Sequence, residues 1–104
     1  MLDELLHRLD SWAYLRVERR PGSVSLRVRD LVVGALNLAS QVLSVDVAGD
    51  MVGRLLEAQP HLRETKSGVS VHITDLDSRA VAEALLRWRI ELERFGPQLL
   101  AASP

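Results

Sequence analysis

The sequence predicts an α+β fold, a two-layer sandwich in which an antiparallel meander sheet of four to six strands has a long C-terminal helix and two shorter helices packed on one face. Hydrophobic residues recur every three or four positions between 76 and 95, which is typical of an α-helix. In the runs 14–19 and 23–29 they alternate with polar residues, as in strands with one buried face, and the runs 31–38 and 42–47 are also β-rich. We expect residues 1–104 to form a single domain, with 97–104 as a C-terminal tail.

Residues 2–12 are predicted to form a short amphipathic helix. Its apolar face comprises Leu2, Leu5, Leu6, Leu9 and Trp12. Asp3 and Glu4 stand in the first turn, where the helix dipole favours negative charge. His7 falls outside the apolar face.

Two strand-like runs follow, residues 14–19 and 23–29. In the second run Val24, Leu26 and Val28 alternate with polar residues and share one face. The runs are separated by Arg20-Pro21-Gly22, where Pro presets φ and Gly accepts a positive φ, a combination typical of a type II turn. We therefore predict a β-hairpin.

The middle of the chain mixes strand and helix signals. Residues 31–38 and 42–47 are β-rich, and Gly34 within the first run indicates a bulge or a close approach of another backbone. Residues 50–58 show helical spacing, with Asp50 as the predicted N-cap. Residues 61–65 are predicted to form a short strand or a loop, and residues 69–74 a strand.

The last helix is predicted over residues 76–95. Its apolar stripe comprises Val81, Leu85, Trp88, Leu92 and Phe95. Its start is marked by the potential capping residues Thr74, Asp75, Asp77 and Ser78. Gly96 and Pro97 indicate its end, because Gly adopts left-handed conformations readily and Pro does not continue a helix.

The composition argues against several classes of function. The formal net charge is −1, from 13 basic and 14 acidic residues. Such a balance gives no reason to expect that the protein binds nucleic acid or a membrane surface. The absence of cysteine excludes disulfides, thiolate catalysis and cysteine-ligated zinc. Neither a signal peptide nor a membrane span is recognisable, so we expect a cytoplasmic protein. The basic residues are almost all Arg, a usage typical of GC-rich bacterial genes.

The run from Gly34 to Ile90 resembles the small bacterial proteins grouped as luciferase-domain proteins. The likeness is carried by GALNL, by VLSVDV before a short helix ending in LLEAQPH, by SGVSVHI, and by the Asp-rich cap before ALLRWRIE. Members of that family tend to carry His in the segment matching Ala35–Asn37, and Trp where this chain has Val69. A looser likeness is to the YjbR-type double-wing α+β fold. Neither resemblance implies a catalytic residue, and the luciferase label gives no warrant for light-emitting chemistry.

No constellation of polar residues predicts catalysis. His7, His61 and His72 are far apart and lack the i, i+4 spacing of a helical metal pair. Glycine-rich phosphate loops and the G-x-S-x-G nucleophile motif are absent. We therefore expect no catalytic residue, cofactor or metal ion, and favour a protein that is not an enzyme.

The predicted hairpin is rich in arginine. Its candidate contacts for an anion or a partner are Arg16, Arg19, Arg20, Arg27 and Arg29. Glu18 and Asp30 are interleaved with them, and Tyr14 is the nearest aromatic residue, so nucleic acid is not the expected partner.

Self-association is the expected mode of action. Leu99 and Leu100 are too apolar for a solvated tail, and they or a strand edge are the candidate dimer contacts. We predict a protein that acts through protein–protein contacts as a homodimer. Two alternatives remain open: an anion- or nucleic-acid-binding module using the Arg-rich hairpin, and a small-molecule-binding domain with a pocket between residues 76–95 and the sheet, lined by Trp88.

Overall fold

A computed structural model of the chain describes the backbone of residues 2–101 and the side chains of residues 2–95. Within that range three helices and six strands follow one another in the predicted order. The elements are α1 (Leu2–Asp10), β1 (Arg16–Arg20), β2 (Ser23–Val28), β3 (Leu31–Asn37), β4 (Val42–Asp46), α2 (Gly49–Ala58), β5 (Leu62–Glu64), β6 (Gly68–His72) and α3 (Leu76–Ala101).

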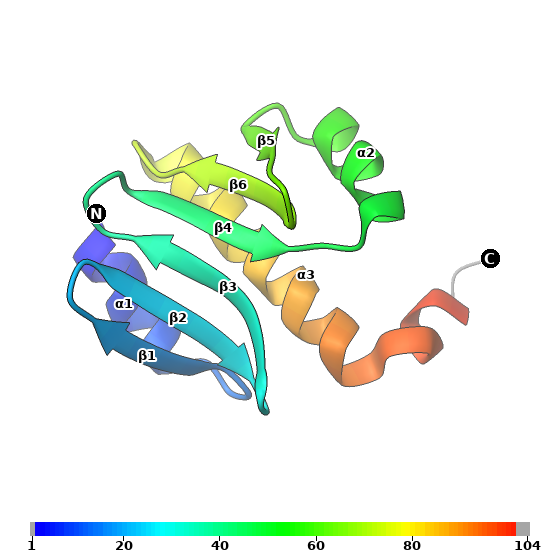
Figure 1. Cartoon of the computed structure of the whole chain (residues 1–104), viewed down its shortest axis with the longest axis horizontal. Coiled ribbons are helices and arrows are strands. Elements are labelled where there is room, and N and C mark those ends of the chain that lie inside the picture. Colours follow the sequence, from blue (N-terminus) through cyan, green and yellow to red (C-terminus); the bar gives the residue numbers. More distant parts are fainter. Residues whose placement is uncertain (1, 102–104) are drawn as a thin grey trace.

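The six strands form one antiparallel sheet with the order β1-β2-β3-β4-β6-β5. The first four strands are consecutive and form the predicted meander. After β4 the chain passes through α2 and β5 before β6 returns beside β4. In Figure 1, α1 and α3 lie behind the sheet and α2 lies near β5, while the front face of the sheet is uncovered. The predicted α+β fold is confirmed.

The core lies between the sheet and the helices α1 and α3. Alternate residues of the central strands point into it; Val24, Leu26 and Val28 of β2 are at most 1% exposed. Leu5 and Leu9 of α1 are fully buried against them. Burying one large aliphatic side chain contributes about 1.5–3 kcal/mol, so this layer contact is the main source of stability.

Two glycines mark sharp features of the hairpins. Gly22 has a φ of 77°, as the third position of the predicted type II turn requires. The pairing of β2 with β3 shifts register beside Gly34, which leaves Val33 as the extra residue of a bulge. A Cβ atom on Gly34 would lie 2.6 Å from the carbonyl oxygen of Ser44, so the predicted close approach is present as well.

α3 begins with reciprocal hydrogen bonds between two of its predicted capping residues. The backbone N–H of Ser78 donates to Oδ1 of Asp75 over 2.8 Å, and Oγ of Ser78 accepts from the backbone N–H of Asp75 over 3.0 Å. The hydrogen bonds from Ser78 lower the pKa of the Asp75 carboxyl. The prediction for α2 is wrong: its N-cap is Ala48, which makes no side-chain hydrogen bond, and Asp50 lies inside the first turn.

The buried face of α3 is rotated from the predicted stripe. Ala82, Leu86 and Ile90 are the residues that face the sheet, at 0%, 0% and 6% exposure, with Leu85 beside them. Val81, Trp88 and Leu92 are half-buried, and Phe95 is 43% exposed. The reason is that the small Ala82 allows the helix to approach the sheet closely, whereas Trp88 packs on the flank towards α2.

α3 also extends beyond its predicted end. The helix continues through Gly96 and Pro97 to Ala101, and its ribbon bends near the C-terminal end (Figure 1). Pro lacks the N–H for one hydrogen bond and its ring crowds the preceding turn, which bends this helix without ending it. The side chains of Leu99 and Leu100, the predicted dimer contacts, lie outside the described residues. No helix within the described chain is long and apolar enough to cross a membrane.

Candidate protein-binding surface

α1 and the first half of α3 run side by side and are joined by a ladder of charged contacts. Glu4 accepts a hydrogen bond of 2.7 Å from Arg79, and four residues further along each helix Arg8 pairs with Glu83. Four residues are about one helical turn, so the two helices are parallel and in register. Partly exposed ion pairs contribute little stability, but they fix how α1 lies against α3.

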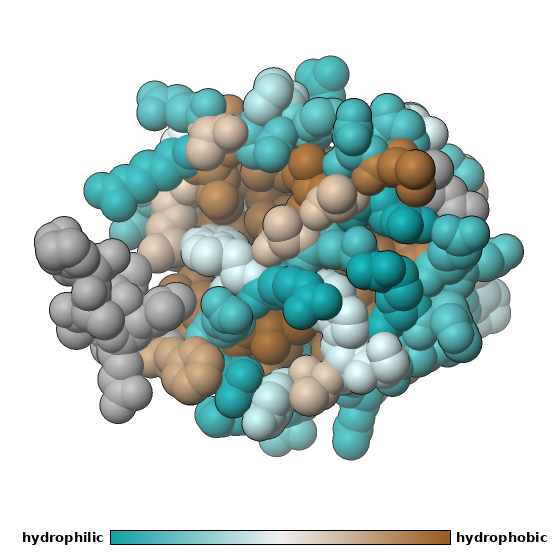
Figure 2. Space-filling view, turned by 180° about the vertical axis from the view of Figure 1, so that it is seen from behind, coloured by the Kyte–Doolittle hydropathy of each residue, from teal (hydrophilic) through white to brown (hydrophobic). Residues whose placement is uncertain are grey.

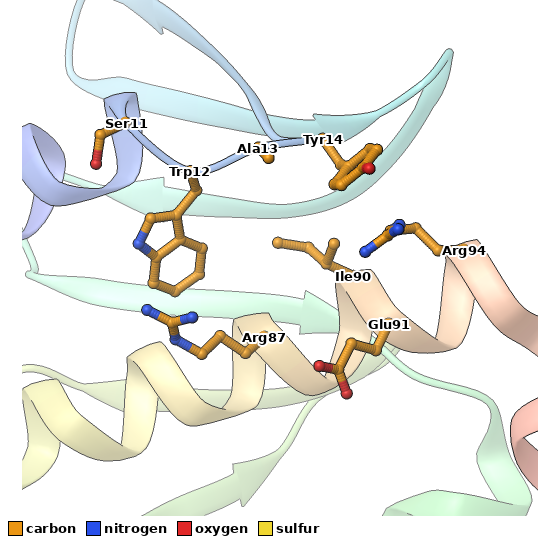
Figure 3. Close-up of a pocket in the computed structure, with 8 residues that line it drawn as sticks. All are labelled: Ser11, Trp12, Ala13, Tyr14, Arg87, Ile90, Glu91 and Arg94. Carbon is orange, nitrogen blue, oxygen red and sulfur yellow. The ribbon is translucent and has the colours of Figure 1, made fainter.

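The next rung of this ladder is aromatic. The guanidinium of Arg87 lies 4.4 Å from the ring centroid of Trp12, within the range of a cation–π contact. α1 has already ended at Asp10, whereas α3 continues, so the two helices no longer cover each other. A hollow of about 350 Å³ opens where they part. It is lined by Ser11, Trp12, Ala13, Tyr14, Arg87, Ile90, Glu91 and Arg94 (Figure 3).

Arg94 lies between two aromatic rings and closes one end of this hollow. Its guanidinium lies 3.6 Å from the ring centroid of Tyr14 and 4.6 Å from that of Phe95. Tyr14 has a φ of 70°, in the left-handed region that a bulky residue rarely adopts. On the far side of Arg94 is a second hollow of about 300 Å³, which Tyr14, Arg94 and Phe95 share with Val28 and Arg29.

These hollows form one surface at the end of the molecule. We call it the aromatic–arginine surface and define it by Trp12, Tyr14, Arg29, Arg87, Glu91, Arg94 and Phe95, together with Leu31, the cross-strand partner of Val28. Tyr14, Leu31 and Phe95 are 60%, 45% and 43% exposed, which is high for large apolar side chains. In Figure 3 the carboxylate of Glu91 is directed away from Tyr14, so guanidinium groups border the hollow on the side of the rings. Figure 2 shows the helix-covered side of the molecule, where hydrophobic residues are visible between hydrophilic ones.

The predicted arginine residues divide between two faces: three of the five share the uncovered face of the sheet, and Arg19 and Arg29 lie apart from them. Arg16, Arg20 and Arg27 point to the uncovered face of the sheet, because they alternate with the buried residues of β1 and β2. Arg19 points to the helix side, where it donates to Asp10 over 2.8 Å and lowers the pKa of that carboxyl. Arg29 follows β2 and belongs to the aromatic–arginine surface.

Glu18 further reduces the positive charge of the hairpin. Its carboxylate lies 3.3 Å from Nε of Arg27 and 3.9 Å from a terminal nitrogen of Arg20. Arg16 is the cross-strand neighbour of Arg27 on the same face. The hairpin thus presents a small mixed-charge patch, which weakens the anion-binding alternative.

The histidines and acids do not assemble a metal centre. His7 is exposed on α1, while His61 and His72 lie near each other beside β5 and β6. Among the described residues, no group of three His, Asp or Glu side chains is placed to hold a metal ion.

Trp88 lines an apolar pocket between α3 and the edge strand β5 of the sheet, and α2 contributes a further wall. The pocket lies between α2, β5 and α3 and has a volume of about 170 Å³. It is lined by Leu55, Gln59, Leu62, Val81, Ala84, Leu85 and Trp88. This volume is below the roughly 300–1,000 Å³ typical of small-molecule sites, so the pocket does not favour the small-molecule alternative.

Sequence reasoning missed Arg87, Arg94 and Glu91, because helical spacing places them only on the polar side of α3. One signal was present: Glu4, Arg8 and Trp12 have the same i, i+4 spacing as Arg79, Glu83 and Arg87, with opposite charges in the first two pairs. This match predicts that the two helices are parallel only if α1 and α3 are already known to cover the same face of the sheet.

No family model, curated protein or solved structure matches this chain. The resemblance to luciferase-domain proteins therefore stays a prediction.

Proposed function

We propose that this protein acts through protein–protein contacts, without catalysis, and that a second copy of the chain docks on the aromatic–arginine surface. The observation that carries the proposal is the exposure of Tyr14 and Phe95 on either side of Arg94. On the arginine usage and the sequence features described above, we further propose a bacterial, cytoplasmic protein.

The composition of this surface supports a protein partner. Trp, Tyr and Arg are the residues most enriched among interface hot spots. Here Trp12 and Tyr14 are each held by a guanidinium, so little side-chain freedom remains to be lost when a partner binds. The hollows on both sides of Arg94 offer pockets for partner side chains.

The charges of the surface support a second copy as the partner. Arg29 is followed by Asp30, and Glu91 stands on α3 between Arg87 and Arg94. A two-fold contact places the same patch on both copies. Because the patch carries both signs of charge, the acidic side chains of one copy can pair with the arginines of the other. The last turns of α3, which contain the proposed dimer contacts Leu99 and Leu100, continue directly from this surface.

The sheet edges are poorer candidates for a dimer contact. β1, one edge strand, consists of Arg16–Arg20 and carries four charged side chains in five residues. Charged side chains on an edge oppose pairing with a second sheet. β5, the other edge strand, has three residues and packs against α2.

Analytical ultracentrifugation over a range of protein concentrations tests the proposal. The wild-type chain is expected to sediment as a dimer at micromolar concentration, and the double variant Tyr14→Ser, Phe95→Ser to dissociate at least about tenfold more readily. Leu76→Ser is the matched control, because Leu76 is 63% exposed at the opposite end of α3.

A folded wild-type monomer across this range would refute the self-association proposal. A dimer that Tyr14→Ser, Phe95→Ser leaves intact, while Leu76→Ser weakens it, would place the contact elsewhere. Circular dichroism of each variant establishes that it has folded.

A further inference from the structure

The uncovered face of the sheet holds a polar hollow that is separate from the aromatic–arginine surface. It lies at the β5 edge and has a volume of about 460 Å³. Five polar residues line it: His61, Arg63, Ser70, His72 and Thr74. In Figure 1 the front face of β4, β6 and β5 is free of helices, so this hollow opens to solvent.

The sheet register brings these residues together. Arg63 of β5 is the cross-strand partner of Ser70 of β6, so their side chains stand side by side on the same face. His72 lies two residues further along β6 and therefore on that face too. Its cross-strand partner, Val42 of β4, forms an apolar part of the wall together with Pro60.

The lining is a set of hydrogen-bond donors. Arg63 has five N–H groups in a planar fork, each of the two hydroxyl groups can donate one hydrogen bond, and each neutral imidazole has one N–H group. Nδ1 of His61 lies 3.0 Å from Oε1 of Gln59, a contact that orients the ring and uses its N–H group, so Arg63, His72 and the two hydroxyl groups remain as the donors of the lining. The lining contains no carboxylate, and among the described residues no acid lies within ion-pair distance of Arg63.

We infer that this hollow binds the phosphate group of a small phosphorylated molecule. A phosphate monoester has three terminal oxygens that accept several hydrogen bonds, which matches a lining with many donors and a guanidinium. The volume lies in the range of small-molecule sites and leaves room for an organic part beside the phosphate. Val42 and Pro60 provide the apolar contact for that part.

Nucleic acid is a poorer occupant of this face. Single strands bind by stacking their bases on aromatic side chains. The aromatic residues of this chain are Trp12, Tyr14, Trp88 and Phe95, and they line the α1–α3 hollows or the pocket between α2 and α3. The lining of the hollow at β5 and β6 therefore contains hydrogen-bond donors but no Trp, Tyr or Phe side chain on which a base could stack.

Titration of the 15N-labelled full chain by NMR tests this inference. Inorganic phosphate, ribose 5-phosphate and ribose are the three probes. Both phosphates are expected to shift the amide signals of residues 61–63 and 70–74 in a saturable way, with the phosphate ester binding more tightly, and ribose alone to shift none.

Arg63→Gln is expected to weaken ribose 5-phosphate binding about tenfold, because a charged hydrogen-bond donor is lost. His72→Gln is expected to weaken it several-fold. Arg16→Gln is the matched control, since Arg16 is an exposed arginine on the same sheet face at the opposite edge, and it is expected to leave binding unchanged.

The inference is overturned if neither phosphate binds at millimolar concentration, or if Arg16→Gln weakens binding as much as Arg63→Gln. Saturable binding of Zn²⁺ at His61 and His72 without phosphate binding would assign the hollow to a cation instead. Sedimentation measured with and without ribose 5-phosphate separates this site from the proposed dimer contact, because neither result depends on the other.

Discussion

The guanidinium of Arg94 lies 3.6 Å from the ring centroid of Tyr14, which joins α3 to the segment that follows α1. Tyr14 is 60% exposed, and its backbone has a left-handed conformation with a φ of 70°. Strained backbone and exposed apolar rings both cost free energy, and such features cluster at functional sites. The contact is therefore the part of the surface where substitution is most informative.

Arg94→Lys keeps the charge and removes the planar group that stacks between two rings. The stacked guanidinium orients the two rings that we propose the second copy contacts, and cation–π contacts at exposed sites contribute about 0.5–1 kcal/mol. If this orientation is lost, the dissociation constant of the proposed dimer is expected to rise by roughly two- to fivefold. Sedimentation equilibrium measures this change. Arg54→Lys, at an exposed position on α2, is the control and should leave the constant unchanged. If Arg94→Lys and Arg54→Lys change the dissociation constant equally, the stacking of Arg94 on the two rings does not contribute to the dimer.

Two glycines should respond to alanine in opposite directions. A Cβ atom on Gly68 would lie 2.1 Å from the carbonyl oxygen of Val45 and 2.5 Å from the backbone nitrogen of Val47, so Gly68→Ala forces β4 and β6 apart. Overpacking of this kind typically costs about 1–3 kcal/mol. Gly53 in α2 has no atom within 4 Å of such a Cβ, so Gly53→Ala should stabilise the protein by about 0.4–1 kcal/mol.

Urea unfolding of both variants measures these differences in the free energy of unfolding. A Gly68→Ala variant as stable as the wild type would mean that β4 and β6 do not approach as closely as described. A destabilised Gly53→Ala variant would mean that the exposed side of α2 is in fact packed.

The Asp75 cap should make stability depend on pH in the acid range. Its hydrogen bonds from Ser78 lower the pKa in the folded state, so the unfolded chain binds the proton more readily. The stabilisation is therefore complete above the ordinary carboxyl pKa of about 4 and is lost as the pH falls through the lower pKa of the folded protein.

Unfolding curves of the wild type and of Asp75→Asn at a series of pH values measure this contribution. We expect the wild type to lose its advantage over the variant on going below about pH 4. The comparison removes the parallel contribution of Asp10, whose pKa is lowered by Arg19 in both proteins. A constant difference between the curves down to strongly acid pH would contradict the proposed cap.

Local chemistry made part of this fold predictable. The Pro21-Gly22 turn, the Gly34 bulge and the Asp75 cap each depend on residues within a few positions of one another or on one backbone contact. The alternation of Val24, Leu26 and Val28 was sufficient to fix which face of β2 is buried. These features need no knowledge of distant segments.

The predictions that were wrong depend on tertiary packing. Trp88 has the hydrophobic spacing of a core residue, but Ala82 decides how closely α3 approaches the sheet, and the helix rotates accordingly. The predicted end of α3 is wrong for a related reason. Gly96 and Pro97 bend the helix but do not end it, and it continues to Ala101.

The candidate site was the least predictable part. Arg16 and Arg19 are near each other in sequence, yet strand alternation sends them to opposite faces. Arg87 and Arg94 became candidates only because residues 75 to 80 positions apart in the chain meet where α1 and the segment after it lie against α3. Contacts over that separation are decided by the packing of the whole domain. The matching i, i+4 spacing of opposite charges on the two helices was the one sequence signal of this contact.

The most direct test is the distance between two copies, measured by pulsed electron paramagnetic resonance on single spin labels. The chain has no cysteine, so Asp30→Cys at the edge of the aromatic–arginine surface and Leu76→Cys at the other end of α3 each provide one labelling site. Leu76 and Phe95 are separated by about 29 Å along the helix. We predict a dipolar coupling between copies for Asp30→Cys, at a clearly shorter distance than for Leu76→Cys. No coupling at either position, or a shorter distance at Leu76→Cys, would contradict a dimer formed through this surface.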